Sequence, residues 1–485
     1  MRLGWIGLVA TVGCQGMALD KDAEDDVEIT AGPTFYQDVL PIVGENCQSC
    51  HNTAEPMGGA FPLETYDHVA PLADTLLAKM RPEGDLTDDP FFMPPFYARD
   101  TAECATVLPW RGDFQASGPE VEIFEAWIIA GKQEGDPDLP TDFTPRVVAE
   151  IEGDDLIDLS YKGEYEVPAP TDDITDTFRC FAVEFPETRT ITLTEDMWVD
   201  AFEFIPGNTK LVHHMLAYVV PNLGAHIASG LAEDGSSNSW TCAGGVSRND
   251  GTFDIPVDSL LYGWVPGSQP LVLEEDMAMR LEAGTGLVLQ IHYNTLGVGS
   301  ADDRTDLSTL RIRPAETPSR EARIRLFGVS GGWDSERVED PPFLVPAGAR
   351  DHVESYAEVM PDSVDDIDLR IWGVVPHMHL AGTSLRFSRV QTSGDEDCLA
   401  HVPRWDFNWQ QFYQYDGAFE DLPRLRGGET LRLSCTLDNT DDNVFLDRYL
   451  GGAVEAGIEL GESTSEEMCL IALGMACEGL CPDDI

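Results

Sequence analysis

Residues 165–481 limit the possible folds more than any other part of the sequence. This stretch consists of short runs of β-forming side chains separated by Gly, Pro, Asn and Asp. Residues 190–193, 211–220 and 287–293 are examples of such runs. Regular short strands with turn residues between them are typical of β-sandwiches. No long helical period appears in this stretch, and it is long enough for two sandwiches. We therefore expect a mainly β fold.

The preceding part of the chain carries a different signal. Cys47, Cys50 and His51 form the Cys-x-x-Cys-His pattern of covalent c-type haem attachment, in which two thiols hold the porphyrin and the imidazole binds the iron. The surrounding segments 35–42, 93–95 and 121–131 resemble a small all-α bacterial cytochrome c domain over residues 33–138. That resemblance implies Met93 as the sixth iron ligand. Met57 and Met80 remain alternatives.

The N-terminus indicates export. Arg2 precedes a short apolar run that ends at Cys14, which is typical of a signal peptide over residues 1–14. Val12, Gly13 and Cys14 also resemble a bacterial lipobox, so a lipid anchor at Cys14 and plain cleavage are both open. We expect a periplasmic or extracellular protein, with an outer-membrane lipoprotein as a variant. Residues 15–32 are expected to be an acidic tether and residues 139–164 a linker.

Charge excludes some partners. The chain has 30 Lys and Arg against 87 Asp and Glu, which gives a formal net charge of −57. Such a surface repels the phosphate backbone, so we expect no nucleic-acid partner, and anionic membranes are disfavoured. Beyond the N-terminus no apolar run reaches the roughly 18 residues of a membrane span.

Five histidines lie in positions suited to metal ligands. His377 and His379 follow an alternating segment, 367–372, and on a continuous strand their side chains would share one face. Alone, this pattern is more often a pair of hydrogen-bonded surface residues. His213 and His214 are adjacent, so joint binding requires a bulge, a strong twist or a strand end. His292 lies in an apolar run, where an imidazole without a partner is costly to bury.

Six motifs together resemble one family. They are residues 176–180, 211–215, 261–264, 289–293, 376–382 and 466–469. In this order they are similar to the copper type II ascorbate-dependent monooxygenases, which include dopamine β-monooxygenase and peptidylglycine α-hydroxylating monooxygenase. The resemblance implies two jelly-roll-type β-sandwich domains, expected at residues 165–318 and 319–482, after the cytochrome c domain.

The resemblance also implies two copper ions. Its ligand positions match His213, His214 and His292 for an electron-storing copper, and His377, His379 and Met468 for the copper that binds O₂. A thioether is a soft ligand that favours Cu(I) and is rarely recruited by zinc. A Met that only fills the core is the other interpretation of Met468.

The cysteines fit an exported protein. Apart from Cys14, Cys47 and Cys50, an even set remains: Cys104, Cys180, Cys242, Cys398, Cys435, Cys469, Cys477 and Cys481. Disulfides are therefore expected. By resemblance Cys435 and Cys469 are the pair that fixes the loop carrying Met468, whereas the other pairings stay open.

These observations predict an exported copper-dependent monooxygenase that hydroxylates an sp³ C–H bond of a small substrate with O₂. A covalently bound haem c would supply electrons, one at a time, from an external one-electron donor. Two alternatives remain: a non-enzymatic haem and copper electron-transfer protein, and a zinc hydrolase, for which we find no suitably placed acidic base.

The substrate-anchoring positions of the peptide-processing relatives are changed. Val375, Leu470 and Ala472 stand where those relatives have Arg, Asn and Tyr that hold a substrate carboxylate. An Arg fork depends on two charge-assisted hydrogen bonds, which Val375 cannot make. We therefore expect a small uncharged or cationic substrate rather than a glycine-extended peptide, unless Arg370 or Arg386 takes over the anchoring.

Overall fold

The structure is a computed structural model. It describes residues 32–53, 61–81, 93, 97–102, 104–112, 115–139, 143, 149–170, 176–242, 245–255, 259–295, 304–328, 336–338, 342–407, 409–461 and 465–482. The predicted signal segment, Cys14, nearly all of the predicted tether, and Met57 lie outside these residues. Within them, no helix is long and apolar enough to cross a membrane.

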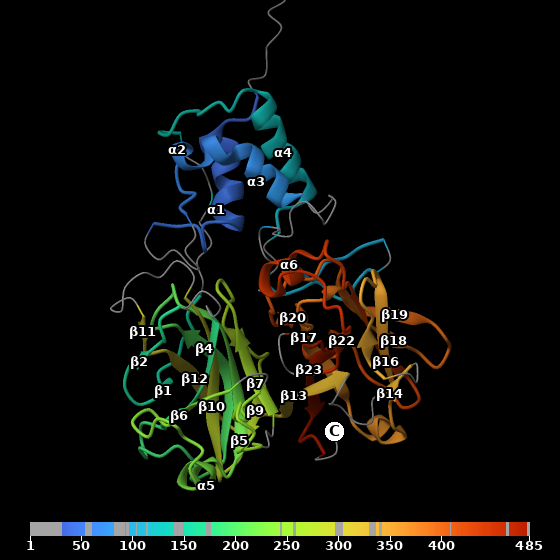
Figure 1. The fold of residues 1–485 in the computed structure, drawn as a ribbon. Coiled ribbons are helices and arrows are strands. Elements are labelled where there is room, and N and C mark those ends of the chain that lie inside the picture. Colours follow the sequence, from blue (N-terminus) through green and yellow to red (C-terminus); the bar gives the residue numbers. More distant parts are fainter. Residues whose placement is uncertain are drawn as a thin grey trace, which may run out of the picture.

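Helices gather in the N-terminal part, at the top of Figure 1. They are the π-helical turn η1 (Phe35–Val39), α1 (Leu40–Asn46), α2 (Tyr66–Val69), the 3₁₀ turn η3 (Ala70–Leu72), α3 (Ala73–Met80) and α4 (Gly118–Ile129). α4 begins at a capping box, in which Ser117 and Glu120 satisfy each other's backbone N–H groups. Phe35, Phe124 and Trp127 are fully buried in a core that belongs to these helices.

A nine-stranded sheet runs through the rest of the molecule. Its strands, in order across the sheet, are β1 (Ile157–Ser160), β12 (Thr309–Ala315), β4 (Met197–Ile205), β9 (Met277–Leu281), β13 (Arg320–Gly328), β23 (Leu470–Glu478), β17 (Leu369–His377) and β20 (Tyr413–Gln414), with β8 (Leu271–Val272) beside β4. β9 and β13 pair in parallel, whereas the other named pairs of this sheet are antiparallel. The β9–β13 pair joins the first half of the β region to the second.

A five-stranded sheet covers each half of the shared sheet. The first contains β6 (Ser239–Thr241), β3 (Asp176–Ala182), β10 (Thr285–Asn294), β5 (Val212–Pro221) and β7 (Ser259–Trp264). The second contains β14 (Glu336–Arg337), β16 (His352–Val359), β21 (Thr430–Leu437), β18 (Gly382–Val390) and β19 (Glu396–Val402). Facing sheets meet through rings such as Phe202 with Tyr262, and Phe327 with Phe387.

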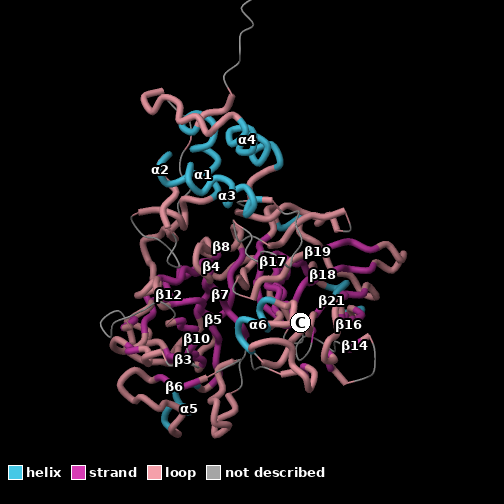
Figure 2. The backbone as a smooth tube through the Cα atoms, turned by 45° about the horizontal axis from the view of Figure 1, so that its top comes forward, coloured by secondary structure: helices cyan, strands magenta, loops and turns pink. Residues whose placement is uncertain are grey.

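Short elements complete the β halves. They are the ribbons β2 (Tyr165–Glu166) with β11 (Thr305–Asp306) and β15 (Leu344–Val345) with β22 (Ile458–Glu459), together with α5 (Leu223–Ala228), η4 (Asp362–Asp366), η5 (Phe419–Asp421) and α6 (Val444–Leu450). Figure 2 shows the same division from a second view, with strands filling the part below the N-terminal helices. The predicted mainly β fold with β-sandwiches is confirmed.

Two segments depart from the expected domain plan. The predicted linker, residues 139–164, contains β1 (Ile157–Ser160), and Leu159 of this strand is fully buried in the core of the β region. Residues 97–112 lie within the predicted cytochrome range, yet Tyr97 and Trp110 belong to the core of the β region. The rings of Trp110 and Tyr415 stack with their centroids 4.6 Å apart. The Tyr97 hydroxyl donates to Oδ2 of the buried Asp406 at 2.9 Å. No local pattern indicates the position of residues 97–112, because the partners Asp406 and Tyr415 are some 300 residues away. We call residues 97–112 the strap.

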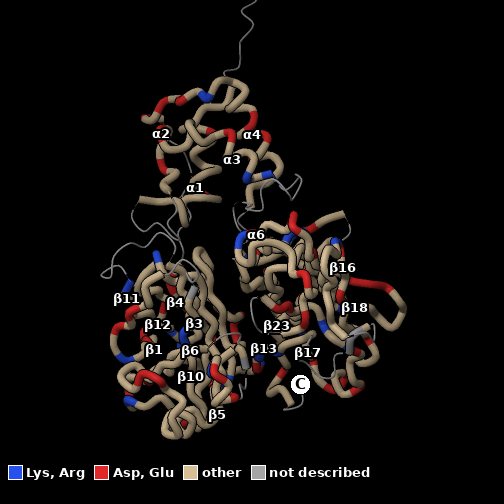
Figure 3. The backbone as a smooth tube through the Cα atoms, viewed as in Figure 1, with Lys and Arg blue, Asp and Glu red and all other residues tan. Residues whose placement is uncertain are grey.

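All eight remaining cysteines form disulfides, as expected. The pairs are Cys104–Cys398, Cys180–Cys242, Cys435–Cys469 and Cys477–Cys481. The first fastens the strap to β19, and the third is the pair implied by resemblance. Asp and Glu residues occur along the helices and along both β halves, whereas Lys and Arg residues are fewer (Figure 3).

Candidate metal centres and haem attachment site

The first sandwich brings three histidines together. His213 and His214 lie on β5, and His292 lies on the neighbouring β10. In the pairing of these strands His292 is opposite His214, but Tyr293 is opposite Val212, so His213 is the extra residue of a β-bulge. The bulge supplies the irregularity that two adjacent histidines need in order to face one site.

The three imidazoles converge closely. Their nitrogen ligand atoms all lie within 4.8 Å of one another. The Nδ1 atoms of His213 and His292 each lie 3.3 Å from Nδ1 of His214. Burial lowers the pKa of His214 well below its usual value, and the neighbouring His292 and His213 lower it further. Imidazole nitrogens at this spacing are suited to share one metal ion.

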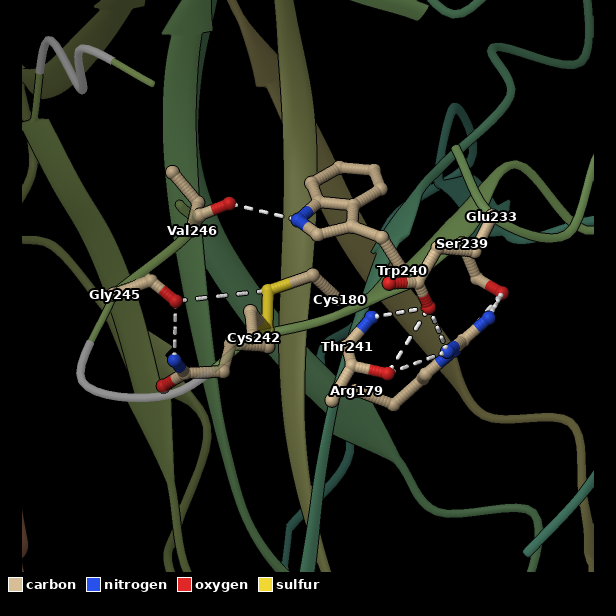
Figure 4. Close-up of a disulfide and its surroundings, with 10 residues drawn as sticks. Arg179, Cys180, Glu233, Ser239, Trp240, Thr241, Cys242, Gly245 and Val246 are labelled. Carbon is tan, nitrogen blue, oxygen red and sulfur yellow. Dashed lines mark hydrogen bonds and ion pairs between the residues drawn. A yellow bond between two sulfur atoms is a disulfide. The ribbon is translucent and has the colours of Figure 1, made fainter. Parts of the chain in front are cut away.

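The surroundings hold this set in place. The ring of Phe178 stacks on His292 with centroids 4.2 Å apart and planes 8° from parallel. Two residues further along β3, Cys180 forms the disulfide with Cys242 (Figure 4). Gln290, two residues before His292, donates through Nε2 to the Gly245 carbonyl at 2.5 Å. β3 and β10 are therefore fixed beside the histidines by a covalent bond and by hydrogen bonds.

The second histidine pair lies at the end of β17, in the other half of the shared sheet. We expected His377 and His379 on one face of a continuous strand, but β17 ends at His377 and His379 follows in a loop. The strand stops because the backbone N–H groups of His379 and Ala381 donate to the Glu467 side chain instead of a neighbouring strand. The two rings nevertheless approach, with centroids 5.1 Å apart. Met378 points away from them into the core.

Each of these imidazoles has one nitrogen occupied by a hydrogen bond. His377 Nδ1 lies 2.5 Å from Gln410 Oε1, and His379 Nδ1 lies 3.0 Å from the Glu466 carbonyl. Because both partners are acceptors, Nδ1 carries the proton in each ring and Nε2 keeps its lone pair for a metal. Burial lowers the pKa of His377 to about 3, with His379 as a further cause.

Glu467 joins the backbone of Met468 to that of His379. The buried Glu467 carboxylate accepts the backbone N–H groups of His379, Ala381 and Met468. Burial raises the pKa of Glu467 to about 7, against the opposing effect of these donors. Cys469 is disulfide-bonded to Cys435, and the next residue, Leu470, pairs with His377 across β23 and β17. One carboxylate thus organises both sides of the second set, a role that the sequence alone did not suggest.

The two sets are near enough to influence each other. His377 is among the groups that lower the pKa of His214, after burial, His292 and His213. The first set lies on the five-stranded sheet of one half, and the second on the shared sheet of the other.

The haem attachment motif is at the end of α1. Cys47 and Cys50 are not in disulfides, and burial raises the pKa of the Cys47 thiol to about 12. His51 Nδ1 lies 2.7 Å from the Phe61 carbonyl, which leaves Nε2 for a metal. These residues fit a c-type haem, because two thiols stand next to an imidazole whose tautomer is already fixed.

The three candidate sixth ligands differ in position. Met80 is 4% exposed and packs in the core of the helical part. Met93 is half-buried, and its backbone N–H donates to the Lys79 carbonyl at 3.1 Å. Met57 lies outside the described residues. Met93 as the sixth ligand therefore stays a prediction.

Metal-free protein should lose stability in acid. The pKa of His377 falls from 6.5 in the unfolded chain to about 3 in the fold. Between these values the unfolded chain binds a proton that the folded chain does not, so this contribution to stability is intact above pH 6.5 and is lost as the pH falls. We expect about 1 kcal/mol per pH unit below 6.5. The urea midpoints of metal-free parent and His377→Gln protein at pH 7.5, 6.5 and 5.5 measure this loss of stability. If the midpoint falls equally with pH in both proteins, the prediction is wrong.

Comparison with known proteins gives one informative similarity. The chain is 24% identical over 317 residues to DBH-like monooxygenase protein 1 of Homo sapiens, and 23% identical over 313 residues to the protein of that name from Gallus gallus. Each match covers 63% of this chain and 45% of the relative, so the chain matches less than half the length of these relatives. The similarity supports a DBH-like monooxygenase family. No protein-family profile matches the chain.

Solved structures add no argument. The major capsid protein P2 of bacteriophage PM2 has a TM-score of 0.23 at 10% identity, covering 67% of this chain and 98% of that chain. Allantoicase has a TM-score of 0.15 at 8% identity, covering 65% of this chain and 81% of that chain.

Proposed function

We propose that this protein is an exported copper monooxygenase that hydroxylates an sp³ C–H bond of a small substrate with O₂. The observation that carries the proposal is the pairing of two ligand sets: three converging imidazoles, and a His-His-Met set arranged around Glu467. The similarity to DBH-like monooxygenases supports the same class of reaction.

Copper suits the donor atoms better than zinc does. His213, His214 and His292 offer neutral nitrogens for an ion that stores an electron. The second set adds the thioether of Met468, which favours Cu(I), the oxidation state that meets O₂. When bound, these ions supply one-electron redox chemistry and activation of O₂. The protein's own contribution is to fix the imidazole tautomers through Gln410 Oε1 and the Glu466 carbonyl.

The helical part provides a place for the electron source. Its two thiols and His51 fit covalent haem c, which passes one electron at a time and would be refilled by an external donor. Four disulfides agree with an oxidising compartment, and the N-terminal signal pattern with export. Anchoring through a lipid at Cys14 remains part of the proposal.

The substrate is proposed to be small and uncharged or cationic. Val375 pairs with Ala472, and His377 with Leu470, so the three altered positions are buried apolar residues on the strand pair that carries His377. Arg370 is not available as a substitute anchor, because its guanidinium binds Asp368 and the carbonyls of Glu420 and Leu422. Arg386 forms an ion pair with Glu396, in which Nη2 lies 3.2 Å from Oε1.

The test loads the protein with haem and copper and combines metal analysis with O₂ uptake. We expect two copper ions and one haem iron per chain. We also expect saturable, O₂-dependent hydroxylation of neutral or aminated aromatics, with little or none of glycine-extended peptides. Hydroxylation of the peptides alone would refute the substrate class, and zinc in place of copper would refute the reaction. Full metal content with no C–H substrate oxidised would favour the second candidate, a haem and copper electron-transfer protein.

Haem ligation has its own prediction. Met93→Ala should remove the sulfur-to-iron charge-transfer band and lower the haem potential, because Met and His ligation raises that potential. Met80→Ala is the matched control and should cost stability, since its side chain is in the core, while the band stays. Loss of the band in Met80→Ala or Met57→Ala, and not in Met93→Ala, would show that another Met is the ligand.

A further inference from the structure

The haem attachment motif touches the first sandwich at one glycine. Gly267 lies in the turn between β7 and β8, and a Cβ atom built on it would lie 2.8 Å from the Cys50 Sγ. The turn is tight, because the Ser268 N–H donates to the Val265 carbonyl at 3.0 Å. Gly267 has φ +85°, a conformation that strains any other residue. Both the backbone and the approach of Cys50 therefore require glycine here.

The same turn holds the chain that leaves the helical part. Gln269 Oε1 accepts the backbone N–H of Ala149 at 3.0 Å. Arg111 of the strap donates to the Val272 carbonyl at 3.2 Å and forms an ion pair with Glu274. Residues that follow Gly267 thus bind segments that connect the helical part to the β region.

From this contact a short path leads to the three histidines. Trp264, three residues before Gly267, ends β7 and pairs with Met215 on β5. Met215 directly follows His214. The path from Gly267 to His214 consists of three residues of chain, one pair of neighbouring strands and one peptide unit. The Cα atoms of Gly267 and His214 are therefore at most about 20 Å apart.

We infer that the turn at Gly267 is the surface through which electrons pass from the haem motif to the three-histidine site. The inference rests on the proposed function, which supplies the haem and the copper. Transfer of one electron oxidises ferrous haem to ferric and reduces one cupric ion at this site to cuprous, and no bond forms or breaks. Gly267 is a positioning residue, since it acts by letting Cys50 approach.

The parent protein gives the first test. Oxidised protein that holds haem and copper is given one electron anaerobically by a light-triggered reductant, and the reduced haem band is followed. We expect the band to rise and then decay at a rate independent of protein concentration, with loss of Cu(II) EPR signal. In His292→Ala the decay should disappear. Undiminished decay in that variant would overturn the inference, because the electron would then have another acceptor.

Gly267→Ala tests the contact itself, with Gly163→Ala as the matched control. Gly163 has φ +79° and nothing within 4 Å of a built Cβ, so it reproduces the backbone strain without the contact. We expect decay several-fold slower in Gly267→Ala, an unchanged haem spectrum and copper content, and parent-like decay in Gly163→Ala. If the reduced haem decays in Gly267→Ala at the parent rate, the inference about the turn is wrong, whereas haem can still be the electron source. Haem that is never reoxidised in the parent would instead refute haem as the electron source, and if Gly267→Ala fails to fold, the His292→Ala comparison decides.

Discussion

Met468→Ile is expected to abolish hydroxylation while the haem spectrum and copper binding at the three-histidine site stay as in the parent. The substitution removes a soft sulfur donor and puts a hydrophobic side chain of similar volume in its place. Met468 is 8% exposed, so the cost in folding free energy should be less than about 1.5 kcal/mol. Turnover, copper content and X-ray absorption of the Cu(I) form, in which a Cu–S contribution is visible, measure the outcome.

Met475→Ile is the matched control. Met475 lies on β23, the strand that begins two residues after Met468, and is 1% exposed in the core, where it pairs with Ile371 and Arg323. It should show a similar or larger loss of stability and keep its turnover and Cu–S signal. If Met468→Ile hydroxylates at the parent rate, Met468 is a core residue and not a ligand.

The sequence predicts the elements of this fold better than their assembly. Short runs of β-forming residues indicated the strands, and β5 and β10 lie where such runs were recognised. The pairing of β9 with β13, which merges both halves into one sheet, depends on contacts between distant segments and has no local signature. The strap is hidden for the same reason, because Tyr97 finds its partners Asp406 and Tyr413 far along the chain.

The candidate site shows a similar division. Residue type and order pointed to the histidines, and the adjacency of His213 to His214 required the irregularity that the bulge provides. The groups that orient the second set were not found. Gln410 is one polar residue in a loop. Glu467 lies within the motif 466–469, but the motif pointed to Met468 and Cys469, and the role of Glu467 appears only when the fold buries it beside His379.

Glu467→Gln is expected to have the largest effect on the second metal set. The carboxylate offers two acceptor oxygens, of which one serves His379 and Met468 and the other serves Ala381. A glutamine amide keeps one acceptor and turns the other into a donor, which then faces a backbone N–H. Two buried donors facing each other leave both unsatisfied, so we expect a loss of about 3 kcal/mol in the free energy of unfolding.

Copper affinity at the second set should fall by about 10- to 100-fold, because the loop that carries His379 and the residue Met468 lose their common partner.

Glu429→Gln separates this local effect from general destabilisation. Glu429 is 5% exposed in the same half of the molecule and accepts the Arg426 N–H at 3.0 Å, away from both sets. That control should lower the urea midpoint and leave Cu(I) competition titrations unchanged. If both variants lose copper equally, or if Glu467→Gln keeps parent affinity and stability, Glu467 does not organise the site. A selective loss in Glu467→Gln would make this carboxylate the residue that couples His379 to Met468.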